Sequence, residues 1–260
     1  MIIKLKTRRI GEARVVRMIP LMSGFRVALV VTAIAASCAS ALDTNIVIRA
    51  AAARPIITDF GYDVKPPYPV LLDPKGTLMG ERQRDWLFSG LERSTATWSV
   101  LAQQIPVARL DKTPGPAIGY SMDQWPGYEF ERRRLLRHFV DRKIRNPVVL
   151  TGDIHCNWAN ELIADFDELD SRPVATEFIG TSISSSGDGT ATPQTTDHRP
   201  AENPFVKFFN AERGYVRCDI TPQQWRTDYR TVPFVTKPRA PLNTRATFVV
   251  ESGHARLNRV

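Results

Sequence analysis

The sequence predicts an α/β protein, and three features of the chain support this fold class. Helical patterns over residues 80–93 and 129–145 alternate with apolar strand patterns over 97–104 and 148–150. This alternation of helix and strand is typical of layered α/β proteins. After residue 155, strand patterns follow one another with few helices between them. Such a run indicates an antiparallel sheet. We therefore expect an α/β part followed by a sheet of antiparallel strands.

Residues 1–54 differ in composition from the remainder. Residues 1–26 carry +6 of the formal net charge of +8, which leaves +2 for residues 27–260. The apolar run 27–36 and the tripeptide Ala39-Ser-Ala41 follow. A basic start, an apolar run and small residues outline a secretory signal, and Arg8-Arg9 suggests a twin-arginine signal. The alternative is a segment that is not native to the fold. We therefore divide the chain into a leader, 1–54, and a globular part, 55–260.

Composition excludes several classes of protein. The nearly balanced charge of the globular part does not fit a general nucleic-acid binder, which needs a clustered basic face. A protein that is tethered to membranes or binds nucleic acid would depend on the leader alone, whose apolar run is shorter than the ~20 residues that span a bilayer. Cys38, Cys156 and Cys218 form no C-x-x-C pattern, so neither a disulfide framework nor a structural zinc site is expected.

The first part of the globular region combines an irregular connection, a helix and a strand. Residues 59–77 are rich in Pro and Gly and predict an irregular surface segment. The helix over 80–93 places Trp86, Leu87 and Leu91 on one apolar stripe. The strand over 97–104 ends before Pro106, which cannot donate a hydrogen bond to a neighbouring strand.

A loop and a second helix come next. The loop over 111–128 contains Tyr120, Trp125 and Tyr128, which either line a substrate pocket or fix the loop to the body. The helix over 129–145 points its apolar side chains inward. We expect its arginines to form a solvated face rather than a phosphate clamp; they are Arg132, Arg133, Arg134 and Arg137.

The segment Asn146–Asn160 carries the residues most suggestive of chemistry. Its apolar run 148–150 lies between Pro147 and Gly152 and predicts a buried strand. Asp153 and His155 follow, and residues two apart in extended backbone point to the same side. One carboxylate and one imidazole so placed are typical metal ligands. The alternative is that Asp153 caps a turn and His155 is an ordinary surface or core histidine.

The Cys156 thiol lies beside His155, but adjacent residues of a strand face opposite ways, so a Cys–His nucleophile pair is not expected.

The remaining strands are expected at 160–165, 174–180, 214–219, 225–232 and 246–251. The polar stretch 181–194 contains Gly187-Asp188-Gly189, but no helix start follows, so it is not a phosphate-binding P-loop.

The motif TGDIHCNWANEL around Asp153 and His155 resembles the Gly-Asp-x-His signature of the alkaline phosphatase D (PhoD-like) metallophosphatases. The resemblance extends to the segments 80–104, 164–189, 207–225 and 245–253. It covers about Asp59 to the C-terminus and corresponds to the second half of such a phosphatase. It implies part of a calcineurin-like metallophosphatase α-β-β-α sandwich, the second half only.

The resemblance also implies a function. It indicates a metal-dependent phosphoric ester hydrolase, a phosphomonoesterase or phosphodiesterase, with Ca²⁺ and Fe³⁺ as cofactors. Asp153 and His155 would be catalytic metal ligands, and Gln104 would bind substrate, unless it is a buried glutamine that satisfies backbone groups. Substrates would be small or polymeric phosphate esters, without specific nucleic-acid recognition. The protein would be periplasmic or secreted and would have no stable membrane span.

The sequence also departs from the family pattern. The Asp-rich and Asn-His motifs that supply the other metal ligands are not found before Asp59. Phe205 stands where relatives commonly have His, and Leu42-Asp-Thr-Asn45 lacks the arginine of an Asp-Thr-Arg motif. We therefore expect this chain to lack part of the active site. The alternative function is a non-catalytic truncated fragment, which needs a missing N-terminal half or self-associates through an exposed apolar sheet.

Overall fold

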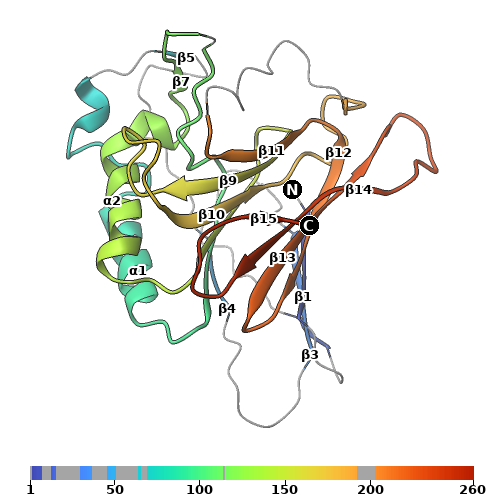
Figure 1. Cartoon of the computed structure of the whole chain (residues 1–260), viewed down its shortest axis with the longest axis horizontal. Coiled ribbons are helices and arrows are strands. Elements are labelled where there is room, and N and C mark those ends of the chain that lie inside the picture. Colours follow the sequence, from blue (N-terminus) through green and yellow to red (C-terminus); the bar gives the residue numbers. More distant parts are fainter. Residues whose placement is uncertain are drawn as a thin grey trace.

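The structure, a computed structural model, describes residues 69–113, 115–191 and 203–260, together with the main chain of the strands at 2–7, 13–15, 30–36, 46–50 and 64–65. Two β-sheets stack face to face, and helices α1 and α2 cover the outer face of one of them (Figure 1). Within the described residues no helix covers the second sheet. The predicted α/β class is confirmed. The described residues form three layers, which are two sheets and one layer of helices (Figure 1).

The six-stranded sheet has the order β11-β9-β10-β8-β6-β4. Four of its strands are parallel: β4 (Ile46–Ala50), β6 (Trp98–Ala102), β8 (Pro147–Thr151) and β10 (Pro173–Ile179). β9 (Asn157–Ile163) runs antiparallel to β10, and β11 (Val206–Asn210) runs antiparallel to β9. The β6, β8 and β10 strands are buried along most of their length, as expected for parallel strands between two layers.

The seven-stranded sheet has the order β15-β14-β13-β12-β1-β3-β2. An antiparallel series forms one part of it: β12 (Arg213–Ile220), β13 (Gln224–Val232), β14 (Asn243–Glu251) and β15 (Asn258–Arg259). β1 (Ile2–Thr7) pairs with β12 in parallel, and β3 (Val30–Ala36) and β2 (Ala13–Val15) follow it. A two-stranded sheet joins β5 (Val64–Lys65) and β7 (Tyr120–Ser121).

The helical layer packs on the six-stranded sheet. Helix α1 (Glu81–Glu92) buries Leu87 and Leu91, and α2 (Glu129–Asp141) buries Leu135, Leu136 and Phe139. Two short 3-10 turns, η1 (Pro69–Leu72) and η2 (Trp125–Tyr128), lie before them. The expectation for Trp86 was wrong, because its side chain is 45% exposed. The buried residues of the helix are Leu87, Gly90 and Leu91, and Phe88 is partly buried against the same core.

The predicted solvated arginine face of α2 also needs correction. Arg134 and Arg137 are exposed, but the side chain of Arg132 is only 1% exposed. Its guanidinium binds both carboxylate oxygens of Glu129, at 2.6 and 2.8 Å, and lies over the ring of Phe166. A buried charge is tolerated when a hydrogen-bonded partner accompanies it. Arg132 therefore packs between α2 and the segment that follows β9.

The core between the two sheets is apolar and rich in aromatic side chains. Trp98 from β6 meets Trp225 from β13 with ring centroids 5.8 Å apart, and Phe208 packs on Tyr229 at 4.8 Å. The inward positions of β12 are Val216, Cys218 and Ile220, while the residues between them are half-buried. This alternation is the pattern of a sheet with one covered face.

The open face of the seven-stranded sheet is polar across β12–β14. Arg217 and Arg226 form ion pairs with Asp228, and Thr247 donates a hydrogen bond to the same carboxylate at 2.8 Å. The expected apolar exposed face is therefore not found in these strands. Charged side chains at alternate positions instead keep this face compatible with water.

Each expected strand is present, with two shifted starts: β9 begins at Asn157 rather than at the expected Asn160, and β14 begins at Asn243 rather than at residue 246. The other described strands were not predicted; they are β1–β5, β7, β11 and β15. No helix within the described residues is long and apolar enough to cross a membrane. The leader residues Arg8, Arg9, Cys38 and Ala39–Ala41 lie outside the described residues.

Candidate functional site

The candidate site lies where β6, β8 and β10 end. These strands are parallel, so their carboxyl ends meet at the same edge of the six-stranded sheet. The segments that follow them are residues 103–104, 152–156 and 180–182, and main-chain hydrogen bonds connect these segments. The Gly152 amide donates to Gln104 at 3.1 Å, and the Gly180 amide donates to Thr151 at 2.9 Å. Ligands of open α/β sheets bind outside this edge.

Asp153 and His155 lie in the turn after β8, and both side chains are exposed. Their φ angles are 71° and 52°, so both residues are in the left-handed region. This was not expected, because the side-by-side arrangement was inferred from extended backbone. Residues in this region are uncommon outside glycine, although Asp and His are among the enriched types. Exposed side chains on such a tight turn are free to meet a ligand.

Two side chains hold the main chain of His155. Its carbonyl oxygen accepts hydrogen bonds from the Thr181 hydroxyl at 2.9 Å and from the Arg213 guanidinium at 2.8 Å. The Ser186 hydroxyl lies 3.5 Å from Nδ1 of the His155 ring. The turn is thus held from the end of β10 and from β12 together, while the imidazole stays accessible.

A second acidic residue, Asp123, belongs to this region and was not predicted. Burial raises the pKa of Asp123; the charge of Asp153 adds to the rise, whereas Lys112 opposes it. The two carboxylates are therefore close enough to influence each other. Asp123 lies in the loop before η2, where no motif in the sequence distinguished it from a turn residue.

The two glutamines at the end of β6 have different roles. Gln104 is half-buried, and its carbonyl accepts the Gly152 amide, so its main chain supports the Asp153 turn. Gln103 is buried and donates to Thr151 Oγ1 at 2.7 Å, while its Oε1 accepts the indole N–H of Trp125 at 3.1 Å. The buried glutamine that satisfies neighbouring groups is thus Gln103. Substrate binding by Gln104 stays a prediction.

The aromatic loop 111–128 is fixed to the body. Trp125, Tyr120 and Tyr128 are 1%, 7% and 6% exposed, so little of their surface is open to a ligand. Phe205 is likewise buried and packs edge-on against Phe166, with centroids 4.8 Å apart. Of the two alternatives for the loop aromatics, these burials favour the one in which they anchor the loop.

Asp153 and His155 meet only part of what a metal centre needs. Asp153 and His155 offer a hard oxygen and an imidazole nitrogen, which suit the expected ions. Within the described residues, however, no three His, Cys, Asp or Glu side chains gather in a way that would hold a metal ion. The described residues by themselves therefore do not make a metal centre.

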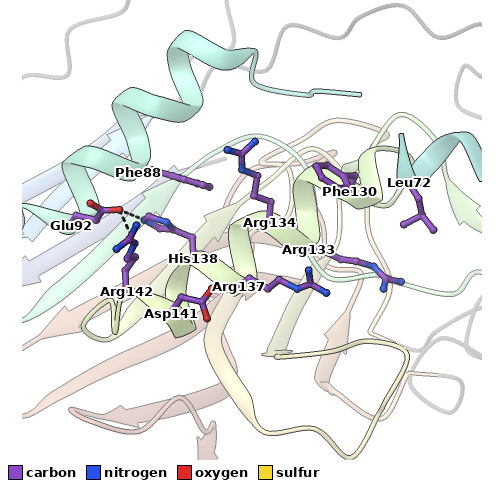
Figure 2. Close-up of a pocket in the computed structure, with 10 residues that line it drawn as sticks. All are labelled: Leu72, Phe88, Glu92, Phe130, Arg133, Arg134, Arg137, His138, Asp141 and Arg142. Atoms are coloured by element: carbon purple, nitrogen blue, oxygen red, sulfur yellow. Dashed lines mark ion pairs between the residues drawn. The ribbon is translucent and has the colours of Figure 1, made fainter. Parts of the chain in front are cut away.

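A groove on the helical layer is lined by other residues than those at the carboxyl edge of the six-stranded sheet. It lies between α1 and α2, and Phe88, His138 and four arginines contribute to its walls: Arg133, Arg134, Arg137 and Arg142 (Figure 2). Arg133 binds Glu129 and Asp167, and Arg142 lies 3.3 Å from Glu92. Half of these arginines are thus already paired with carboxylates, which does not resemble a preformed phosphate clamp.

Comparison with known proteins identifies the family. The family model described as PhoD-like phosphatase matches residues 40–229, more than half of the chain. The chain belongs to the PhoD-like phosphatase family. The match begins at residue 40, before the expected start of the globular part at residue 55, so its first part overlaps the predicted leader.

Two relatives of this family illustrate the extent of the similarity. Alkaline phosphatase D of Bacillus subtilis (strain 168) is 45% identical over 196 residues, which are 75% of this chain and 34% of that protein. A solved structure described as the structure of PhoD superposes with a TM-score of 0.77 at 42% identity and covers 82% of this chain and 41% of that one. The chain thus spans less than half the length of both relatives. The predicted family and fold are confirmed.

Proposed function

We propose that this chain takes part in metal-dependent hydrolysis of phosphoric esters, as a phosphomonoesterase or phosphodiesterase of the alkaline phosphatase D type. One observation carries the proposal. In a member of the PhoD-like family, the Gly152-Asp153-x-His155 motif lies at the carboxyl edge of β8, with both side chains exposed. Its substrates would be phosphate esters, either small or polymeric, and the protein would act in the periplasm or outside the cell.

The chemistry of the site supports a role for cations. A phosphate ester is an anion, and the carboxylates of Asp153 and Asp123 would repel it in the absence of a neutralising charge. Bound metal ions would supply that charge and would lower the pKa of an attacking water. By resemblance these ions are Ca²⁺ and Fe³⁺. The remaining ligands would come from outside the described residues.

Within this scheme the described residues have separate tasks. Asp153 would hold a cation through its carboxylate, and His155 would bind a cation or donate a hydrogen bond to a phosphoryl oxygen. The raised pKa of Asp123 follows from burial and from Asp153, so a cation at Asp153 would lower it again. Gln104 would contact substrate through its half-buried side chain.

The test is a phosphatase assay of the full chain with p-nitrophenyl phosphate and bis-p-nitrophenyl phosphate, with and without Ca²⁺ and Fe³⁺. Asp153→Asn and His155→Asn are expected to abolish nitrophenol release. Asp170→Asn, an exposed position in a turn distant in sequence from the site, is the matched control and is expected to retain it. Release that is absent, or equal in all variants, contradicts the proposal.

A second candidate is a non-catalytic fragment that needs a further protein segment or associates with itself. The lack of a metal-ligand cluster within the described residues favours it. The polar open face of β12–β14 means that association there would use ion pairs and hydrogen bonds rather than apolar burial. Sedimentation velocity together with elemental analysis of the purified protein separates the two: a folded monomer that contains bound metal contradicts the fragment hypothesis.

A further inference from the structure

We infer that Arg213 is a positioning residue of the site: its buried guanidinium fixes the main chain of His155 against the loop that carries Ser186 and Gly187. This inference rests on the proposed function only for its effect on catalysis. Arg213 is the first residue of β12, in the seven-stranded sheet, whereas His155 follows β8 in the six-stranded sheet. The contact therefore joins the two layers at the site.

The conformation of His155 requires such support. Its φ of 52° and that of Asp153, 71°, are in the left-handed region. A non-glycine residue in that region is strained and persists only when its surroundings determine its conformation. The surroundings here are the two donors on the His155 carbonyl, Arg213 Nη1 at 2.8 Å and Thr181 Oγ1 at 2.9 Å.

The same guanidinium also fixes a second segment. Its Nε donates to the carbonyl of Gly187 at 2.9 Å, and its Nη1 also reaches the carbonyl of Ala211 at 3.3 Å. Ser186 precedes Gly187, and its hydroxyl lies 3.5 Å from the ring of His155. One planar group thus sets the distance between the His155 main chain and the residue that lies beside its imidazole.

Arg213 has no counter-charge within the described residues. Its relative exposure is 6%, and all its described acceptors are main-chain carbonyls; no described carboxylate lies within ion-pair distance. A buried charge is costly unless hydrogen bonds compensate it. An arginine that binds three carbonyls fits a geometric task, because its donors have a fixed planar arrangement. A lysine would reach one of these carbonyls but could not reproduce that arrangement.

The experiment compares Arg213→Lys and Arg213→Met in the full chain. Arg245→Met is the matched control, because the Arg245 guanidinium binds Glu212, the neighbour of Arg213, and has no described contact with His155. The first measurement is the ¹H–¹³C NMR signal of the His155 ring, assigned with His155→Asn. The second is kcat and KM for an aryl phosphate ester.

The His155 signal is expected to move in both Arg213 variants and to stay in place in Arg245→Met. We expect kcat to fall by about 10- to 100-fold in Arg213→Met, with a smaller change in KM and partial recovery in Arg213→Lys. If Arg213→Met does not fold, the same measurements on Arg213→Lys decide whether Arg213 positions His155. A folded Arg213 variant with the wild-type His155 signal overturns the inference. If the wild-type chain has no activity, the proposed function fails, and the NMR measurement still decides this inference.

Discussion

The hydroxyl of Thr151 donates a hydrogen bond to the carboxylate of Glu177 at 2.8 Å, across the parallel strands β8 and β10. The same carboxylate accepts the amides of Val107 and Ala108 and the side-chain amide of Asn160, at 2.8, 3.1 and 3.1 Å. Glu177 is fully buried, and all four donors are buried too. One acidic residue thus ties the segment after β6 to both neighbouring strands.

Removal of this acceptor should destabilise the protein. Glu177→Leu leaves four buried donors without a partner, and each unsatisfied group costs about 1–3 kcal/mol. We expect the free energy of unfolding in urea to fall by at least about 3 kcal/mol. Glu177→Gln keeps one oxygen and should lose less, while the exposed Glu168→Gln should change little. A Leu variant with wild-type stability would show that the donors find other acceptors.

The Glu177 network also predicts a pH dependence. Burial raises the pKa of Glu177, although its hydrogen bonds oppose this. The folded protein therefore binds a proton at Glu177 more tightly than the unfolded chain does. The contribution of this proton to the free energy of unfolding is complete below the unfolded pKa of about 4.3 and is lost as the pH rises through the folded pKa. Glu177→Gln cannot titrate. The stability difference between wild type and this variant should accordingly narrow with increasing pH in urea titrations.

His138 should make the protein less stable in acid. Its ring stacks on Phe88 with centroids 3.9 Å apart and lies between α1 and α2 (Figure 2). Burial lowers the pKa of His138, while Glu92 opposes the change. The contribution of neutral His138 to the free energy of unfolding is therefore complete above the unfolded pKa of about 6.5. It is lost as the pH falls through the folded pKa.

The comparison that checks this is His138→Phe, which keeps a stacked ring but cannot be protonated. Between pH 7.5 and 5, the decrease in melting temperature should be smaller in this variant than in wild type by about 2 °C. The exposed His254→Gln serves as the control and should follow wild type. Parallel curves for wild type and His138→Phe would rule out a contribution from His138.

The two described thiols should react differently. Cys218 is fully buried between the sheets, and burial raises its pKa to about 12. At pH 8 only about one Cys218 side chain in ten thousand would be a thiolate, and the thiolate is the reactive form. Cys156 is half-buried in the Asp153 turn. In native protein, iodoacetamide should therefore modify Cys156 and leave Cys218 intact, as measured by peptide mass spectrometry. Modification of Cys218 at a similar rate would indicate that the sheets open readily.

Local patterns predicted much of the fold. The apolar run 148–150 between Pro147 and Gly152 became β8, and the helices were placed to within a few residues. These features depend on neighbours in sequence. The burial of Arg132 could not be predicted in the same way, because it depends on Phe166, which is distant in the sequence. The exposed Trp86 was missed because an apolar side chain at a helical spacing was assumed to face the core.

The site was predictable only in part. The Gly-Asp-x-His motif located Asp153 and His155, but their left-handed conformation is a property of the folded turn. Asp123 and Arg213 belong to a loop and a strand that join the site only in three dimensions, and neither stands in a pattern that indicates chemistry. β11 was missed because residues 206–210 are a short run at the sheet edge, where β9 is its neighbour among the described strands.

The left-handed turn at Asp153 and His155 has a consequence for how this chain would vary. Glycine adopts that backbone region readily, so replacement of either residue by glycine would relieve local strain. Selection for folding alone would thus favour the loss of both side chains, and only a use for the carboxylate and imidazole would oppose it. If the chain has no such use, as the fragment hypothesis holds, no selection would act against substitution of Asp153 or His155 by glycine.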